Sequence, residues 1–193
     1  MTKSDNSTEC SDQQFTSVDF TDVPPEFSEA YDCLFEGCNF QEVDLAHSKF
    51  NDCEFRHCNF SITKIANSVF RNCKFVGCKA LGVNWSSAQR VENCSFTECN
   101  LTSGILMHRD LRNFVFEDSI LIDVDFSSAN MQRAQFANCD LSGATFRNTN
   151  LSRADFSTAK NYDIDPKINI LAKAKFSMPE AVSLLSGLGI ELV

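Results

Sequence analysis

The sequence predicts an all-β solenoid, a four-sided coil in which the chain stacks on itself once every twenty residues. A large apolar residue recurs at every fifth position from Phe35 to Phe75, a period that matches neither a helix nor a strand. A small residue such as Cys53 or Ala154 stands two positions before each large one. Cysteine pairs also recur every twenty residues or so, at Cys33 and Cys38, Cys53 and Cys58, Cys73 and Cys78, and Cys94 and Cys99.

Four five-residue segments per coil place residues twenty apart in one column. The clearest predicted column contains only phenylalanine, at Phe15, Phe35, Phe55, Phe75, Phe96, Phe116, Phe136 and Phe156. The interval between Trp85 and Val91 is one residue longer than the rest, so the register shifts there. We expect Ala88 to take the small slot of that segment and Gln89 and Arg90 to form a bulge.

The chain divides into three predicted regions. Residues 1–32 form an acidic N-terminal segment with an irregular first coil, because Pro24 and Pro25 lack the N–H groups of a regular ladder. Residues 33–159 form the β-helix. Residues 160–193 form a cap, in which Ser177 and Glu180 have capping-box spacing for a short helix over Met178–Ser186, with Gly187 at its end.

The cap carries more apolar residues than a narrow coil requires. We therefore expect a homodimer through this end, with a monomeric cap as the alternative. The candidate interface is Val182, Leu184, Leu185, Leu188, Ile190 and Leu192.

The charge is concentrated at the N-terminus. The formal net charge is −9, and residues up to Glu54 contribute 13 acidic side chains against Lys3 and Lys49. This distribution disfavours direct nucleic-acid binding and favours a basic protein partner. No apolar run is long enough for a signal peptide or membrane span. We expect a cytoplasmic protein without membrane contact.

The cysteines stand in slots that Ala, Ser and Val occupy elsewhere in the repeat, so we expect them to pack as small apolar residues. A metal site is the alternative, but a column of parallel thiols does not offer four converging ligands. We expect neither metal nor cofactor. We also expect no enzymatic activity, because the three histidines have no partners at catalytic spacing and no phosphate-binding glycine motif occurs.

The register shift marks the candidate partner-binding bulge, Gln89, Arg90, His108 and Arg109. Arg109 stands in a small slot, and we expect it to turn outward because an isolated buried charge is unfavourable. Phe114 is also too large for its small slot. A tolerated bulge without a partner is the alternative to a binding site.

The repeat resembles the pentapeptide-repeat family, as in Cys38-Asn-Phe-Gln-Glu, Cys139-Asp-Leu-Ser-Gly and Ala154-Asp-Phe-Ser-Thr. The resemblance implies a right-handed quadrilateral parallel β-helix. Length, acidity and the C-terminal helix with its apolar tail are similar to the Qnr, MfpA and McbG-like subgroup, as is the segment Asp163–Asn169.

This resemblance implies a DNA-mimicking protein that binds DNA gyrase or topoisomerase IV and protects it from quinolones or a toxin. The candidate acidic surface is Glu36, Glu42, Asp44, Asp52, Glu54, Glu98, Glu117, Asp118, Asp123 and Asp125. The alternative is a non-catalytic interaction scaffold with a different protein partner.

Overall fold

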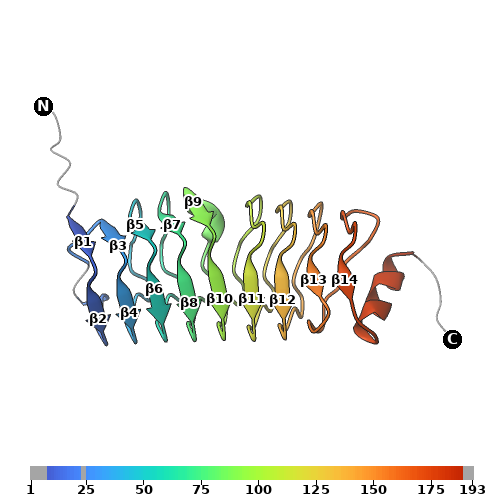
Figure 1. Ribbon diagram of the computed structural model, residues 1–193, viewed down its shortest axis with the longest axis horizontal. Coiled ribbons are helices and arrows are strands. Elements are labelled where there is room, and N and C mark those ends of the chain that lie inside the picture. The colour runs from blue at the N-terminus through green and yellow to red at the C-terminus, as the bar shows by residue number, and fades with distance from the viewer. Residues whose placement is uncertain (1–7, 23–24, 189–193) are drawn as a thin grey trace, which may run out of the picture.

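The computed structural model describes residues 8–22 and 25–188, which form a rod of stacked four-sided coils (Figure 1). The strands and two 3₁₀ helices, in chain order, are β1 (Glu9–Ser11), β2 (Gln14–Thr16), β3 (Glu29–Tyr31), β4 (Leu34–Glu36), β5 (Lys49–Asn51), β6 (Glu54–Arg56), β7 (Val69–Arg71), β8 (Lys74–Val76), η1 (Trp85–Ser87), β9 (Arg90–Glu92), β10 (Ser95–Thr97), β11 (Val115–Glu117), β12 (Gln135–Ala137), β13 (Asp155–Phe156), β14 (Lys175–Phe176) and η2 (Glu180–Leu188).

Each side of the coil is a wall of parallel backbone pairs. Wall 1 is a nine-stranded sheet that runs from β2 to β14, and wall 4 begins as the five-stranded sheet β1-β3-β5-β7-β9. Walls 2 and 3 are rows of isolated bridges, such as Asn39 with Asn59 on wall 2 and Asp44 with Lys64 on wall 3. The predicted all-β solenoid is confirmed.

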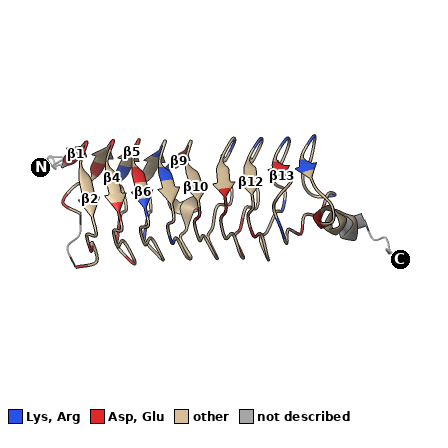
Figure 2. Ribbon diagram, turned by 60° about the horizontal axis from the view of Figure 1, so that its bottom comes forward, with Lys and Arg blue, Asp and Glu red and all other residues tan. Residues whose placement is uncertain are grey.

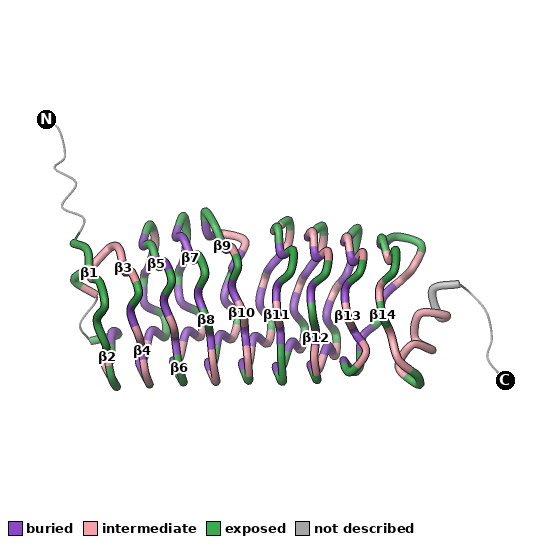
Figure 3. Tube along the Cα trace, in the orientation of Figure 1, coloured by how far each residue is buried: buried purple, intermediate pink, exposed green. Residues whose placement is uncertain are grey.

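The phenylalanine column of wall 1 is confirmed as a continuous stack. The rings of Phe35, Phe55 and Phe75 lie parallel, with successive centroids 4.9 Å apart. Parallel rings are not the preferred aromatic geometry, but the strand spacing of about 4.8 Å imposes it. Edge contacts with the next column, such as Phe50 against Phe55 at 5.5 Å, fill the interior. Buried residues accordingly line the inside of the coil (Figure 3).

The cysteines pack in the small slots of this interior. Cys58 Sγ and Cys78 Sγ each donate to a carbonyl oxygen 23 residues earlier, at 3.3 Å. All cysteines are free thiols, and all except the half-buried Cys10 are buried. Burial raises the pKa of Cys53 and of Cys139 to about 12. These two buried thiols are therefore neutral at physiological pH.

Regular stacking begins earlier than the predicted boundary near Asp32. β1 pairs with β3, which aligns Cys10 with Ala30, and β2 pairs with β4. Phe27 packs against Phe15 with ring centroids 5.4 Å apart. The first coil is thus a full member of the stack, because the Phe15 and Phe20 positions keep the five-residue period despite the later prolines.

The stack also continues past the predicted end at Ala159. Phe156 pairs with Phe176 on wall 1, and Asn150 bridges Ile170 on wall 4. The intervening segment fills the interior with Tyr162, Ile164 and Asn169, which are buried although they do not follow the repeat.

The terminal helix differs from the prediction. It is the 3₁₀ helix η2, which starts at Glu180 and contains Gly187 instead of ending before it. The expected capping box is absent, since the Ser177 hydroxyl donates to the Ser157 carbonyl and a Glu180 carboxylate oxygen accepts from the Asn161 N–H at 3.4 Å. Both side chains are used to attach the cap to the last coils.

The predicted register shift is confirmed. β7 pairs with β9 so that Val69 lies opposite Arg90, 21 residues away. The extra residue is absorbed around η1, and Ala88 is buried while Gln89 and Arg90 are exposed. No helix in residues 8–22 and 25–188 has the length and apolar character needed to cross a membrane.

Candidate functional site

Wall 4 is interrupted after β9. In the described residues, no backbone hydrogen bond or bridge joins 89–93 to 109–113 of the following coil. Pairing on this wall resumes only with the bridge between Asp110 and Asn130. The other three walls stay paired between the same two coils, as between Ser95 and Val115 on wall 1. The two coils therefore separate along one side only, at the bulge near β9 (Figure 1).

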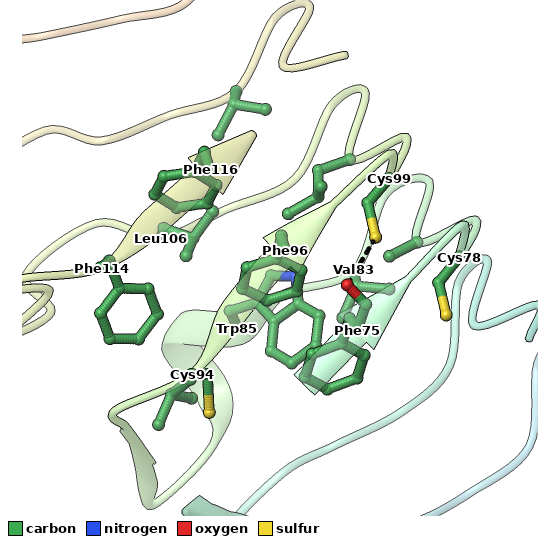
Figure 4. Packing of buried hydrophobic residues seen from close by; sticks show 14 of the residues in the cluster. Phe75, Cys78, Val83, Trp85, Cys94, Phe96, Cys99, Leu106, Phe114 and Phe116 are labelled. Atoms are coloured by element: carbon green, nitrogen blue, oxygen red, sulfur yellow. Dashed lines mark hydrogen bonds between the residues drawn. The ribbon is translucent and has the colours of Figure 1, made fainter. Parts of the chain in front are cut away.

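Phe114 explains the separation. It occupies a small slot but remains buried, and its ring centroid lies 6.1 Å from that of Phe116 (Figure 4). The equivalent slots of the neighbouring coils hold Cys94 and Ala134. The stack responds to the larger side chain, since the Phe96–Phe116 centroid distance is 5.6 Å where Phe75–Phe96 is 4.8 Å. The additional ring volume holds this side of the coil open.

Arg109 spans the interruption, and this corrects the prediction that it turns outward. Its guanidinium reaches back to the preceding coil and donates to the carbonyl oxygens of Ser86 and Ala88, and to that of Gln89 at 3.4 Å. Partial burial lowers the pKa of Arg109 from its ordinary value. The side chain thus satisfies carbonyl groups that the missing ladder leaves without partners.

The interruption forms a surface cleft of about 560 Å³, which we call the wall-4 cleft. It is lined by Gln89, Arg90, Val91, Glu92, Asn93, Arg109, Asp110, Arg112, Asn113 and Phe114. Three of the four predicted bulge residues meet here, while His108 is exposed outside the lining. Asn93, Asp110 and Arg112 were missed, although the oversized Phe114 marked the location.

The charges of the wall-4 cleft are largely paired. Arg112 donates hydrogen bonds to both carboxylate oxygens of Asp110, the shortest at 2.6 Å, and this contact lowers the pKa of Asp110. Glu92 lies within ion-pair distance of Arg90 and Arg71. The lining has no cysteine, histidine or hydroxyl nucleophile. Its polar groups are suited to hydrogen bonding with a partner.

The candidate acidic residues do not form one stripe. On the N-terminal coils, acids alternate with bases along the walls: in the backbone register Glu36 lies opposite Arg56, and Asp44 lies opposite Lys64. In the middle, Glu98 donates its backbone N–H to the Glu117 carbonyl at 2.9 Å, so Glu98, Glu117 and Asp118 gather at one corner. Glu42, Asp52 and Asp123 stand exposed at corners, and Glu54 and Asp125 are half-exposed on walls 1 and 3. Acidic segments are most frequent on the N-terminal coils (Figure 2).

The candidate dimer residues are only partly available. Val182, Leu184 and Leu185 are half-buried on η2, and Leu184 packs against the core of its own chain. Ile190, Leu192 and the side chain of Leu188 lie outside the described residues. Within residues 8–22 and 25–188, no group of three or more His, Cys, Asp or Glu side chains is placed to hold a metal ion.

Two family models match the chain, pentapeptide repeat region over residues 8–88 and pentapeptide repeats over residues 119–157. No curated protein matches it in sequence. Among solved structures, it is similar to full-length QnrB1, a plasmid-mediated fluoroquinolone resistance protein, with 16% identity, a TM-score of 0.60, and coverage of 95% of this chain and 100% of that one.

It is also similar to HetL, a protein involved in heterocyst differentiation regulation from the cyanobacterium Nostoc sp. strain PCC 7120. There the identity is 16%, the TM-score is 0.54, and the match covers 88% of this chain and 84% of that one. At such identities the likeness concerns the fold. Together with the family models and the four-walled stack, it shows that the chain belongs to the pentapeptide-repeat family.

Proposed function

We propose that this protein is a non-catalytic DNA mimic that binds DNA gyrase or topoisomerase IV and protects it from inhibitors such as quinolones or a toxin. The observation that supports this most is the rod itself, which has an acidic N-terminal part and matches QnrB1 over nearly its whole length. The rod supplies the elongated shape, and its acidic part supplies the negative charge, that a mimic of duplex DNA requires.

The electrostatic argument favours the N-terminal coils as the DNA-like part. Duplex DNA carries one negative charge per about 1.7 Å of its axis, and its protein partners present basic surfaces. Exposed acids such as Glu42, Asp44 and Asp52 form no ion pair among the residues that the structure describes. Such exposed charges contribute more to the association rate than to the final affinity. The complex should therefore weaken as salt increases.

The C-terminal end supports a second part of the proposal. Apolar residues of η2, Val182 and Leu185 among them, would pair two copies end to end. This arrangement places the acidic N-terminal coils at both tips of a longer rod. A topoisomerase with two symmetric DNA-binding surfaces could then contact either tip.

The test is a gyrase supercoiling assay with and without a quinolone. We expect added protein to restore supercoiling in the presence of the drug or to inhibit it without the drug. The variant E42Q/D44N should reduce the effect, whereas the matched control D163N/D165N removes equal charge from the C-terminal end and should retain it. An unchanged assay, together with the absence of a captured gyrase complex, would overturn the proposal.

A second candidate function is an interaction scaffold for a different protein, and the wall-4 cleft favours it. The cleft interrupts an otherwise regular surface and presents both amide and guanidinium groups. A partner held there should be lost on Arg90→Ala or Asn113→Ala, and these exchanges leave the N-terminal acids unchanged. Gyrase protection that persists in both variants would assign that activity to the acidic coils instead.

A further inference from the structure

One corner of the rod carries charges sorted by sign along its length. This corner column consists of the residues that follow the wall-4 segment in each coil: Asp12, Asp32, Asp52, Asn72, Asn93, Asn113, Arg133, Arg153 and Lys173. All nine are exposed. Three carboxylates, three amides and three cations follow one another in that order. The twenty-residue register places them in a row, as shown by the Asp32 N–H bonded to the Asn51 carbonyl and the Arg133 N–H bonded to the Ser152 carbonyl.

The backbone does not explain the basic end. Every residue of the column has a positive φ, between 51° at Asn93 and 62° at Arg133. Asp and Asn tolerate this left-handed region better than other non-glycine residues, so the first six positions suit the turn. Arg133, Arg153 and Lys173 do not. They are also the only Lys or Arg residues among the positive-φ positions of the described chain, so their charge needs another explanation.

Interactions within the chain do not explain the column either. Asp12, Asp32 and Asp52 stack on successive coils, where like charges repel one another. None of the six charged members has an ion pair in the described residues. The Asn72 amide donates to Asp52 at 2.8 Å, and the Asn93 amide donates to Asn72 at 3.1 Å. The flanking charges Arg71, Glu92 and Arg112 have partners of their own, so the uncompensated charge belongs to the column.

We propose that the corner column pairs two copies of this chain side by side and antiparallel. The column is complementary to itself when reversed about its central member, Asn93. Asp12 then faces Lys173 of the second copy, Asp32 faces Arg153, and Asp52 faces Arg133. The amides lie between them, with Asn72 opposite Asn113. One twofold axis relates the two copies, so the contact is isologous and by itself closes as a dimer.

The chemistry of this contact makes it weak and dependent on salt. Each exposed ion pair is individually weak, and about 1 M salt shortens the Debye length to about 3 Å, which screens the pairs. The column steps regularly on either side of the wall-4 cleft, and the one wider step, between Asn93 and Asn113, displaces the twofold axis without separating the six ion pairs. A parallel arrangement places Asp against Asp and Arg against Arg and is therefore unfavourable.

Zero-length cross-linking of carboxylates to amines tests the geometry. A mixture of isotopically labelled and unlabelled full-length protein is treated with a carbodiimide at low and high salt. We expect a mixed-isotope linkage between Asp12 and Lys173 at low salt and its loss at high salt. Within one chain these residues are eight coils apart, about 38 Å at the strand spacing of about 4.8 Å, so the link can form only between copies.

Charge exchange supplies an independent test by sedimentation equilibrium. The variant D12K/D32K/D52K and the variant R133E/R153E/K173E should each lose the increase in mass that appears at low salt, and an equimolar mixture of the two should recover it. The sixfold exchange keeps the net charge at −9 and should also recover it. If association depended only on nonspecific charge, the measured mass would instead vary with the net charge of each variant and not with the order of charges along the column.

These tests are distinguishable from pairing through η2. End-to-end pairing brings the two Lys173 residues toward each other and keeps Asp12 at the far tips, and all of these variants leave residues 174–193 unchanged. The inference is overturned if mass has no salt-sensitive step, or if the low-salt species lacks the Asp12–Lys173 link.

Discussion

Phe114 and Phe116 lie two residues apart on one coil and are both buried, with ring centroids 6.1 Å apart. In the other coils from Phe35 onward, the residue two positions before the wall-1 phenylalanine is small, as Cys94 is before Phe96. The second ring prevents wall 4 from closing, and the released carbonyl groups are bound by Arg109. One oversized residue thus accounts for the wall-4 cleft.

Replacing Phe114 with alanine should therefore have a smaller effect than a typical core truncation. Phe→Ala exchanges in cores lower the free energy of unfolding by about 3–5 kcal/mol, depending on how far the site collapses. We expect the lower end for Phe114→Ala, because wall 4 can close, and the upper end for Phe126→Ala in a regular coil. Urea unfolding measures both, and newly slowed hydrogen exchange at Val91 and Asn93 would report closure. If both variants lost the same free energy of unfolding, and hydrogen exchange at Val91 and Asn93 did not slow in Phe114→Ala, Phe114 would not be the cause of the open wall.

Removal of the Arg109 guanidinium should destabilise the rod. Arg109→Met leaves the carbonyls of Ser86 and Ala88 without their donor, and an unsatisfied buried polar group costs about 1–3 kcal/mol. Arg147→Met is the matched control, since Arg147 is exposed and lies outside the corner column, and surface exchanges usually change stability by less than about 0.5 kcal/mol. Thermal or urea unfolding compares them. If both variants lost the same free energy of unfolding, the Arg109 hydrogen bonds would not stabilise the rod more than an exposed arginine does.

The buried thiols should make stability fall at alkaline pH. Burial raises the pKa of Cys53 and Cys139 from 9.0 to about 12 and also raises that of Cys73. Between pH 9 and 12 the folded state keeps protons that the unfolded state releases, so the free energy of unfolding decreases as pH increases. Below pH 9 these thiols should not change the free energy of unfolding as pH varies, because they keep their protons in both states.

Urea unfolding at several pH values measures this effect, with C53A/C73A/C139A as the comparison. The variant should start less stable because small cavities form, but its stability should decrease less steeply above pH 9. Identical slopes would mean that other groups cause the pH dependence.

The end-to-end contact can be examined with two point changes on η2. V182E/L185E places carboxylates at two half-buried positions of the helix and keeps Leu184, which packs against the core. We expect light scattering to show half the mass at high salt, where the corner column does not act, while the far-ultraviolet circular dichroism stays the same. An unchanged mass with intact structure would exclude pairing through this helix.

Much of the fold could be predicted from the sequence because a solenoid repeats a single local rule. The columns of Phe35, Phe55 and Phe75 and the register shift after Trp85 needed only the spacing of large and small residues. The ends could not be predicted in this way. The segment before Phe176 fills the interior with Tyr162 and Asn169, which do not follow the rule. The spacing of large and small residues therefore predicts a cap where the structure has a further coil.

The candidate site was located but its structure was not predicted. Gln89, Arg90 and Arg109 do meet, since the extra residue and the oversized slot are visible in the sequence. The direction of Arg109 depends on carbonyl groups of another coil that lose their ladder partners, and side-chain spacing contains no information about them. The corner column, by contrast, follows directly from the sequence once the twenty-residue register is known.

The interruption of wall 4 also has a mechanical consequence. Three walls bind the two central coils together, whereas the fourth is held by a single arginine side chain. A load that bends the rod stretches whichever wall is on the convex side. The molecule should therefore yield most easily with wall 4 outermost, which gives it one compliant direction at its midpoint and stiff halves on either side.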